Sequence, residues 1–204
     1  MYDFSIPMAL VDYIPVLFFG IAALLLQLDL YDKMRKDAFA LFAAGTINIF
    51  VAGFLKASWK LLYAAGICDF QALNTLFLPL QSIGFLLAGL GVVLMLCTCK
   101  KRALLAVAPP VFGGKMIFIA MMVLGLGAIC AGMACVAAKM KKKSAAVLFV
   151  LSFLCSMCMG YLSSQDSTLA IVNWIEQGVN CAGQGLLLWG VVILHRADLK
   201  QFDL

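Results

Sequence analysis

The chain has 204 residues and a formal net charge of +5; 65% of its residues are apolar and only 12% are charged. A soluble domain is about half apolar and about a quarter charged, so this composition excludes an ordinary soluble enzyme. The basic residues occur in short clusters beside apolar runs, a pattern that reports membrane topology and argues against nucleic-acid binding. We therefore expect an all-α integral protein of the lipid bilayer with no nucleic-acid partner.

Six uncharged runs approach or exceed the roughly 20 residues that a membrane-spanning helix needs. In chain order they are 13–28, 38–55, 70–99, 116–138, 144–165 and 177–194. Little of the chain remains for a soluble domain. Residues 1–204 are therefore expected to form a single membrane domain whose function lies within or at the faces of the bilayer.

The segment 103–114 decides the architecture, because its uncharged residues are interrupted by Pro109-Pro110 and Gly113-Gly114. If it is a loop between six spans, seven basic residues fall on one side of the membrane and eight on the other. If it crosses, twelve fall on one side and three on the other, the asymmetry that the positive-inside rule describes. About six helical and six extended residues reach roughly 28 Å, close to the ~30 Å hydrocarbon core.

We therefore predict a helical bundle of seven spans in a 3+1+3 order, whose fourth span is short and broken at Pro109-Pro110. Irregular backbone cannot face lipid, so that span must be buried among the others. The charge asymmetry puts the N-terminus outside and the C-terminus in the cytoplasm of a multi-pass plasma-membrane protein. The alternative is six spans with a re-entrant or surface segment at 103–114.

Weak internal repeats, 8–98 and 115–195, flank the linker span 103–114. Similar motifs precede the second span and end the third span of each half: "KMRK" (33–36) with "KMKK" (139–142), and "GVVLML" (91–96) with "GVVIL" (190–194). Three spans, one linker span and three spans place both basic turns on the same side, as the charge count requires independently.

This plan is similar to that of the SWEET and PQ-loop transporters, which join two three-helix repeats by one linker helix. Those families carry Pro-Gln in the first helix of each repeat. Here Pro15 is followed by Val16, and the nearest match, "PLQ" (79–81), lies in the third run. The shared plan therefore does not assign the chain to either family.

The last apolar run carries a stripe of four amides, Asn173, Gln177, Asn180 and Gln184, bordered by Glu176. At 100° per residue the four amides fall within about 60° of arc on a helix. Such a stripe is costly against lipid and must face water or other helices. We interpret it as the wall of a polar cavity, whose amides suit a neutral or zwitterionic solute. The alternative is hydrogen bonding between helices.

Other runs offer partners for this stripe toward the outer half of the predicted bundle. The predicted substrate-binding set therefore also contains Asp12, Asn48, Lys56, Trp59, Asn74 and Gln81. We expect Lys56 to pair with Asp12 or Glu176 as the cation of the pocket. Lysines near helix ends also snorkel to the interface, and Lys60 is left out of the set for that reason.

The sequence gives no reason to expect a metal or another cofactor. The close pair Cys155 and Cys158 has no neighbouring His, Asp or Glu, and His195 is the only histidine. Zinc needs four ligands from a few residue types, and no such set converges here. Nucleotide-binding and hydrolase motifs are also missing from the sequence.

Small residues at spacings of four and seven predict close helix packing, and they offer faces for a homo- or hetero-oligomer. These residues are Gly127 with Ala131, Ala128 with Gly132, Gly84 with Gly91, and Gly183 with Gly190.

Three function classes fit these features. The first is a carrier or channel for a small polar solute, favoured by the amide stripe, the broken central span and the repeats. The second is a non-catalytic subunit of a larger membrane complex, which suits a small protein with short loops. The third is an intramembrane enzyme acting on a lipid-like substrate through Asp12, Glu176 and Lys56. An enzyme is the weakest of the three, because neither a nucleophile nor a metal is evident.

Overall fold

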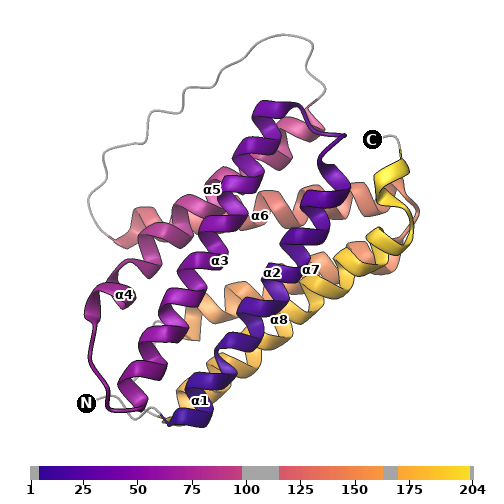
Figure 1. The fold of residues 1–204 in the computed structure, drawn as a ribbon. Coiled ribbons are helices and arrows are strands. Elements are labelled where there is room, and N and C mark those ends of the chain that lie inside the picture. The colour runs from indigo at the N-terminus through magenta and orange to yellow at the C-terminus, as the bar shows by residue number, and fades with distance from the viewer. Residues whose placement is uncertain (1–4, 98–114, 163–169, 203–204) are drawn as a thin grey trace.

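The computed structural model describes residues 5–97, 115–162 and 170–202, and helices form nearly all of these ranges, with no strand among them (Figure 1). The elements are α1 (Ile6–Val11), α2 (Tyr13–Leu30), α3 (Lys36–Ala64), α4 (Gln71–Thr75), α5 (Phe77–Leu96), α6 (Lys115–Lys139), α7 (Lys143–Leu162), α8 (Ala170–Arg196) and the short 3-10 helix η1 (Leu199–Gln201). The predicted all-α architecture is confirmed.

Six apolar stretches of helix are long enough to cross a membrane, among the described residues. They are Ile6–Leu30, Lys36–Ala64, Gln71–Leu96, Lys115–Lys139, Lys143–Leu162 and Ile171–Arg196. The predicted fourth span of the 3+1+3 order, 103–114, lies outside the described residues.

Two of these stretches are interrupted for one residue, and a proline explains each interruption. Proline has no N–H and its ring clashes with the carbonyl four residues earlier. Pro15 therefore disrupts the turn at Val11, where α1 ends, and Pro79 disrupts the turn at Thr75, where α4 ends. The interruption between α1 and α2 falls on Asp12.

The six long helices form a closed ring in which α2, α3, α5, α6, α7 and α8 each pack on the next, and α8 packs back on α2. Glycines allow the closest approaches. A methyl group on Gly91 of α5 would lie 2.7 Å from the carbonyl oxygen of Ala38 in α3. Of the predicted small-residue rows, Ala128 and Gly132 face α5, whereas Gly127 lies near Phe153 of α7.

Two neighbouring pairs in the ring, α5 with α6 and α2 with α8, run parallel. Gly125 of α6 packs on Phe85 of α5, and Gly132 packs on Val92, so both helices advance in the same direction. Likewise, α2 and α8 meet first near Phe18 and Gly185 and later at Asp29 and His195. Cys97, just after α5, and Lys115, at the start of α6, therefore lie at opposite ends of the bundle (Figure 1).

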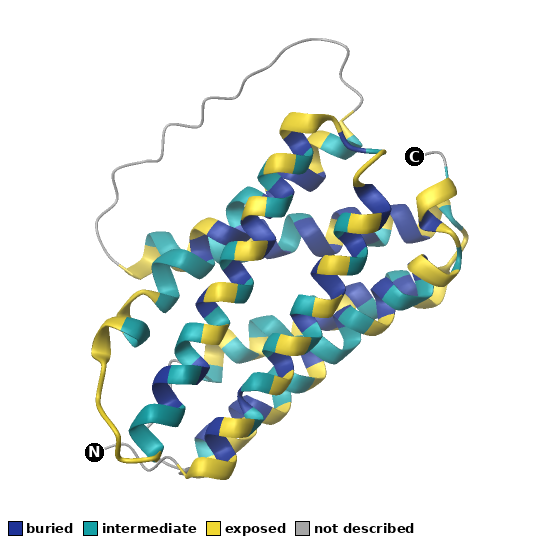
Figure 2. Cartoon of the chain, viewed as in Figure 1, coloured by how far each residue is buried: buried dark blue, intermediate teal, exposed yellow. Residues whose placement is uncertain are grey.

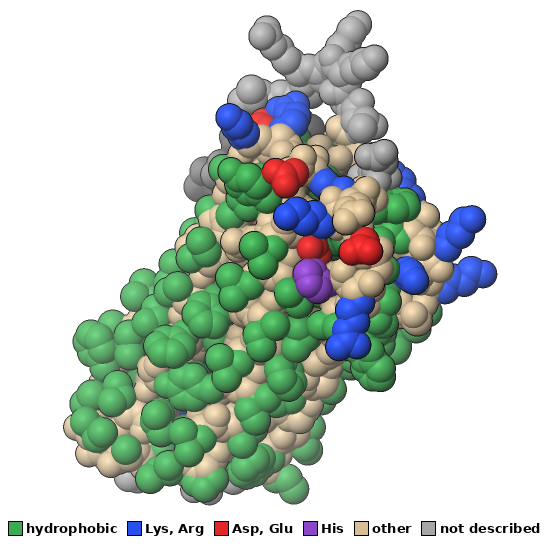
Figure 3. Space-filling view, turned by 45° about the vertical axis from the view of Figure 1, so that its right-hand side comes forward, with side chains coloured by type: hydrophobic (Ala, Val, Ile, Leu, Met, Phe, Trp, Pro, Cys, Tyr) green, Lys and Arg blue, Asp and Glu red, His purple; other side chains and the backbone are tan. Residues whose placement is uncertain are grey.

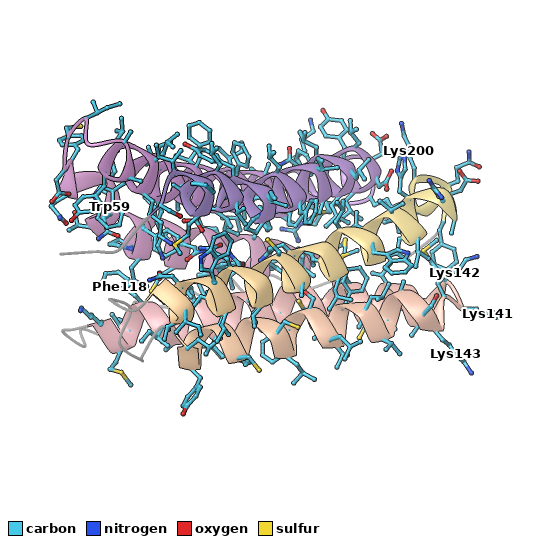
Figure 4. All side chains as sticks on the ribbon, turned by 90° about the horizontal axis from the view of Figure 1, so that it is seen from below. Trp59, Phe118, Lys141, Lys142, Lys143 and Lys200 are labelled. Atoms are coloured by element: carbon cyan, nitrogen blue, oxygen red, sulfur yellow. The ribbon has the colours of Figure 1, made fainter. Side chains whose placement is uncertain are left out.

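Basic residues gather at one end of the bundle. Figure 4 places Lys141, Lys142, Lys143 and Lys200 at that end, opposite Trp59 and Phe118. Apolar side chains cover much of the remaining length of the face in Figure 3, as a lipid-facing surface requires. Buried residues lie on the helix faces that meet other helices (Figure 2).

The apolar core occupies the half of the ring nearer the basic end. Its largest fully buried members come from several helices: Leu30 and Phe42, Val92, Met133 and Val136, Phe149, and Val191 and Leu194. At the opposite half, buried side chains include charged and amide groups. This uneven division of apolar and polar side chains positions the candidate site.

Candidate functional site

An ion pair between Asp12 and Lys60 lies inside the outer half of the bundle, the half away from the basic end. Lys60 Nζ is 2.8 Å from Asp12 Oδ2, and the two side chains are only 6% and 8% exposed. Asp12 is available for this pair because it sits at the interruption before α2 and makes no side-chain capping hydrogen bond. The sequence predicted Lys56 as the cation that pairs with Asp12 or Glu176. The ion pair of Asp12 is made by Lys60, which is one turn nearer the helix end and level with the interruption.

Lys56 instead lies over an aromatic ring. Its Nζ is 4.1 Å from the centroid of Phe77, the first residue of α5, at a distance typical of a cation–π contact. Among the described residues, Lys60, Asp12 and Glu176 are close enough to Lys56 for their charges to act on it. Two lysines and two carboxylates from α3, the α1–α2 interruption and α8 therefore form one cluster.

The cluster lies well inside the helices that carry it. Glu176 is six residues after the start of α8, about 9 Å along the axis, and Lys56 is eight residues before the end of α3, about 12 Å. Both proline interruptions border it, because Asp12 occupies the first and Phe77 follows the second.

The stripe on α8 is buried at its outer part. Asn173 is 2% exposed, Glu176 8% and Gln177 6%, whereas Asn180 and Gln184 are partly exposed. Three buried oxygens on α8, those of Glu176, Gln177 and Gln184 at Oε1, have no hydrogen-bond donor among the described residues. Buried polar atoms nearly always form a hydrogen bond. These three oxygens can therefore accept hydrogen bonds from a ligand or from water.

Trp59 has a structural role that the sequence did not indicate. Its indole Nε1 donates a 3.0 Å hydrogen bond to Oδ1 of Asp69 in the turn after α3, and Gln71 Nε2 donates to both oxygens of the same carboxylate. Trp59 is buried and packs near Tyr63. It therefore ties the α3–α4 connection to the bundle.

Three predicted site residues, Asn48, Asn74 and Gln81, are only partly buried. No hydrogen bond or ion pair joins them to the charged cluster within the described part of the chain. The cluster that the structure assembles consists of Asp12, Lys56, Lys60 and Glu176, with Asn173 and Gln177 within one turn of Glu176 on α8. Gln184 lies about two turns further along the same helix.

A second polar group that the sequence did not predict lies at the basic end. His195 Nδ1 is 3.0 Å from both oxygens of the buried Asp29, and Gln27 Nε2 donates to Thr46 Oγ1 at 2.8 Å. Nearby, an open groove of about 380 Å³ is lined by Leu24, Gln27, Leu28, Tyr31, Asp32, Phe39 and Lys200. In the sequence, the contact of His195 with Asp29 was indicated only by their positions, since each directly follows an apolar run.

The outer cluster contains groups that can bind polar or charged parts of a ligand. It contains donors in Lys56 and Lys60 and acceptors in Glu176 and the amides. The described residues contain no group of three or more side chains suited to hold a metal ion. Comparison with known protein families, curated proteins and solved structures found no match.

Proposed function

We propose that the protein is a carrier for a small polar solute and that the outer charged cluster, with the α8 amides, is its solute site. The observation that carries this proposal is the pair of buried oxygens at the cluster, Oε1 of Glu176 and of Gln177, which accept no hydrogen bond from the described residues. Unpaired acceptors and charges in a membrane interior are costly and usually functional. A solute that donates hydrogen bonds would satisfy them.

A seven-span, 3+1+3 arrangement gives this site an alternating-access framework. The seven-span arrangement is supported by the parallel packing of α5 on α6 and of α2 on α8. With six spans and a surface or re-entrant segment, successive helices would alternate and both pairs would be antiparallel. The residues 98–114 between α5 and α6, if extended at about 3.3 Å each, can reach roughly 56 Å, well beyond a ~30 Å core.

Internal repeats are supported by equivalent helix contacts. Exchanging α2, α3 and α5 with α6, α7 and α8 leaves the order of neighbours in the ring unchanged. Gly91 packs on Phe42 just as Gly190 packs on Phe149. The contact between Gly45 and Gly84 corresponds in the same way to the hydrogen bond from Ser152 Oγ to the Gly183 carbonyl.

The third helices of the two halves also share their polar positions. Counted back from Gly91 and Gly190, Asn74 corresponds to Asn173 and Gln81 to Asn180. Repeat interfaces and interrupted helices are where secondary transporters place their sites. Asn74 and Gln81 therefore remain part of the proposed solute path as the counterparts of the α8 amides.

The distribution of polar and apolar side chains inside the bundle favours a carrier over an open channel. The charged cluster is buried, and the apolar core fills the half of the ring nearer the basic end. Access would then alternate by movement of one half against the other, as in repeat-based transporters. The clustered lysines at the C-terminal end support an orientation with the N-terminus outside and the C-terminus cytoplasmic, in a plasma membrane.

Solute-dependent stabilisation of the purified protein tests this function. A ligand that binds only the folded state raises the unfolding temperature in proportion to the logarithm of its concentration. The proposal expects at least one class among amino acids, sugars, polyols, amines and carboxylates to raise it. Uptake of the same solute should occur only in vesicles that contain the protein. If no class stabilises it and a fixed partner protein co-purifies, the protein is a complex subunit instead.

A further inference from the structure

We propose that the solute is a small zwitterion, with an ammonium group held by Glu176 and a carboxylate held by Lys56. This inference rests on the proposed carrier function and specifies the chemistry of its solute. It comes from the pairing of the four charges of the outer cluster: two of them form an ion pair with each other, and two do not.

Among the described residues, the cluster contains two acidic and two basic groups, of which one acidic and one basic group form an ion pair with each other. Asp12 and Lys60 neutralise each other at 2.8 Å. Glu176 and Lys56 are left, and no ion pair joins either of them to another described residue. Both lie near the Asp12–Lys60 pair: Lys56 is one turn from Lys60 on α3, and the contacts of Phe18 with Gly185 and of Asp29 with His195 set a register of α2 on α8 that brings Glu176 within about one turn of the level of Asp12. The site thus presents one separate anion and one separate cation.

Glu176 has the chemistry of an ammonium site. Its carboxylate is 8% exposed, and Oε1 accepts no hydrogen bond from the described residues. The adjacent Gln177 contributes a second buried acceptor, also without a donor in the described part of the chain. An ammonium group carries three donors and no acceptor, so it can donate to Glu176 Oε1 while it neutralises the carboxylate.

Lys56 has the chemistry of a carboxylate site. The ring of Phe77 attracts and orients its ammonium group without accepting a conventional hydrogen bond. No described residue forms an ion pair with Lys56, so its three N–H donors can bind an acceptor of opposite charge. Because Lys56 and Lys60 lie one turn apart on α3, a carboxylate there would also relieve the repulsion between the two lysines.

Charge balance favours a zwitterion over a simple ion. The four groups sum to zero, and the cluster lies beside an apolar core. A cation or an anion alone would leave one fixed charge uncompensated in a medium of low dielectric constant, which is costly. A solute with one group of each sign compensates both and adds no net charge.

The test compares four probes of nearly equal size on the full-length protein in lipid nanodiscs. L-alanine carries both charges, L-alaninamide only the ammonium, propionate only the carboxylate, and lactamide neither. Further zwitterions, from glycine to L-leucine and β-alanine, cover differences in side-chain size and charge separation. Affinity is measured by calorimetry and by competition with a radiolabelled zwitterion.

We expect at least one zwitterion to bind more than about tenfold tighter than its matched amide, carboxylate and neutral analogues, since truncating one partner of a buried charge pair is strongly unfavourable. Glu176→Gln and Lys56→Gln should each weaken zwitterion binding by more than about tenfold. Lys142→Gln, the same change at the exposed basic end, should leave it unchanged.

Three outcomes contradict the zwitterion proposal. Each can be observed with the wild-type protein, without any variant. If L-alaninamide binds as tightly as L-alanine, the carboxylate is not recognised. If lactamide or a sugar binds and no zwitterion does, the protein is a carrier for a neutral solute, and only the present inference fails. If no solute of any class binds, the proposed function fails with it.

Discussion

The Asp12–Lys60 pair predicts an unusually large effect for a single substitution near a membrane surface. At 2.8 Å and an effective dielectric constant of about 20, the attraction between the two charges is about 6 kcal/mol. Much of this is offset by the loss of hydration of both ions, so the intact pair contributes little net stability. Removing one partner is different, because it leaves the other charge buried without its ion-pair partner at a cost of about 3–5 kcal/mol.

Lys60→Met should therefore lower the unfolding temperature by about 6–20 °C, at about 2–4 °C per kcal/mol for a chain of this size. The double variant Asp12→Leu with Lys60→Met should recover most of that loss, since it buries no lone charge and removes no helix cap. Lys142→Met, at an exposed position, is the control and should change stability by less than about 0.5 kcal/mol.

Thermal unfolding in detergent can be followed by the thiol reactivity of Cys130, which is 3% exposed, on a background in which the other cysteines are replaced. If Lys60→Met unfolds at the wild-type temperature, Lys60 snorkels to the interface and the buried pair does not exist. If the double variant is as unstable as the single one, the loss comes from packing and the electrostatic reasoning is wrong.

Further predictions concern topology, the stripe and the helix packing. With seven spans, an impermeant thiol reagent should label a cysteine at position 3 from outside and one at position 200 only after permeabilisation; labelling of both from one side would restore six spans. Asn180→Leu should weaken solute binding more than stability, and a sharp fall in unfolding temperature with intact affinity would make the stripe structural. Gly91→Ala should destabilise by about 1–3 kcal/mol, because the added methyl group meets the backbone of α3. Gly160→Ala, where the added methyl has open space, should be neutral or stabilising, and equal effects of the two in a thermal melt would argue against the close α3–α5 approach.

The apolar runs predicted the helices well but placed several ends too early or too late. The run that ends at Leu55 continues as helix to Ala64, because Lys56 and Lys60 are accommodated inside the bundle. The first run begins at Tyr13, yet helix starts at Ile6, since a single buried aspartate interrupts the apolar pattern without ending the span. In both cases the charged residues that break the pattern belong to the site.

Part of the buried polar cluster was predictable from residue type and depth, but the pairing of its charges was not. Helical periodicity identified the α8 stripe, and Glu176 and Gln177 do lie buried on it. Which lysine meets Asp12 depends on a shift of one helical turn between α1–α2 and α3, and composition carries no information on that shift. The contact of Asp29 with His195 was missed for a similar reason, because it requires α2 and α8 to be neighbours and parallel.

Uptake by reconstituted vesicles that contain the Glu176→Gln variant tests the solute-site interpretation most directly. The substitution keeps the size of the side chain and its hydrogen-bonding capacity but removes the charge that neighbours Asp12, Lys56 and Lys60. We predict that its uptake, measured from about pH 5 to 8, differs from wild type in pH dependence or in selectivity between charged solutes. An unchanged rate, pH profile and selectivity would contradict the account and remove Glu176 from the mechanism.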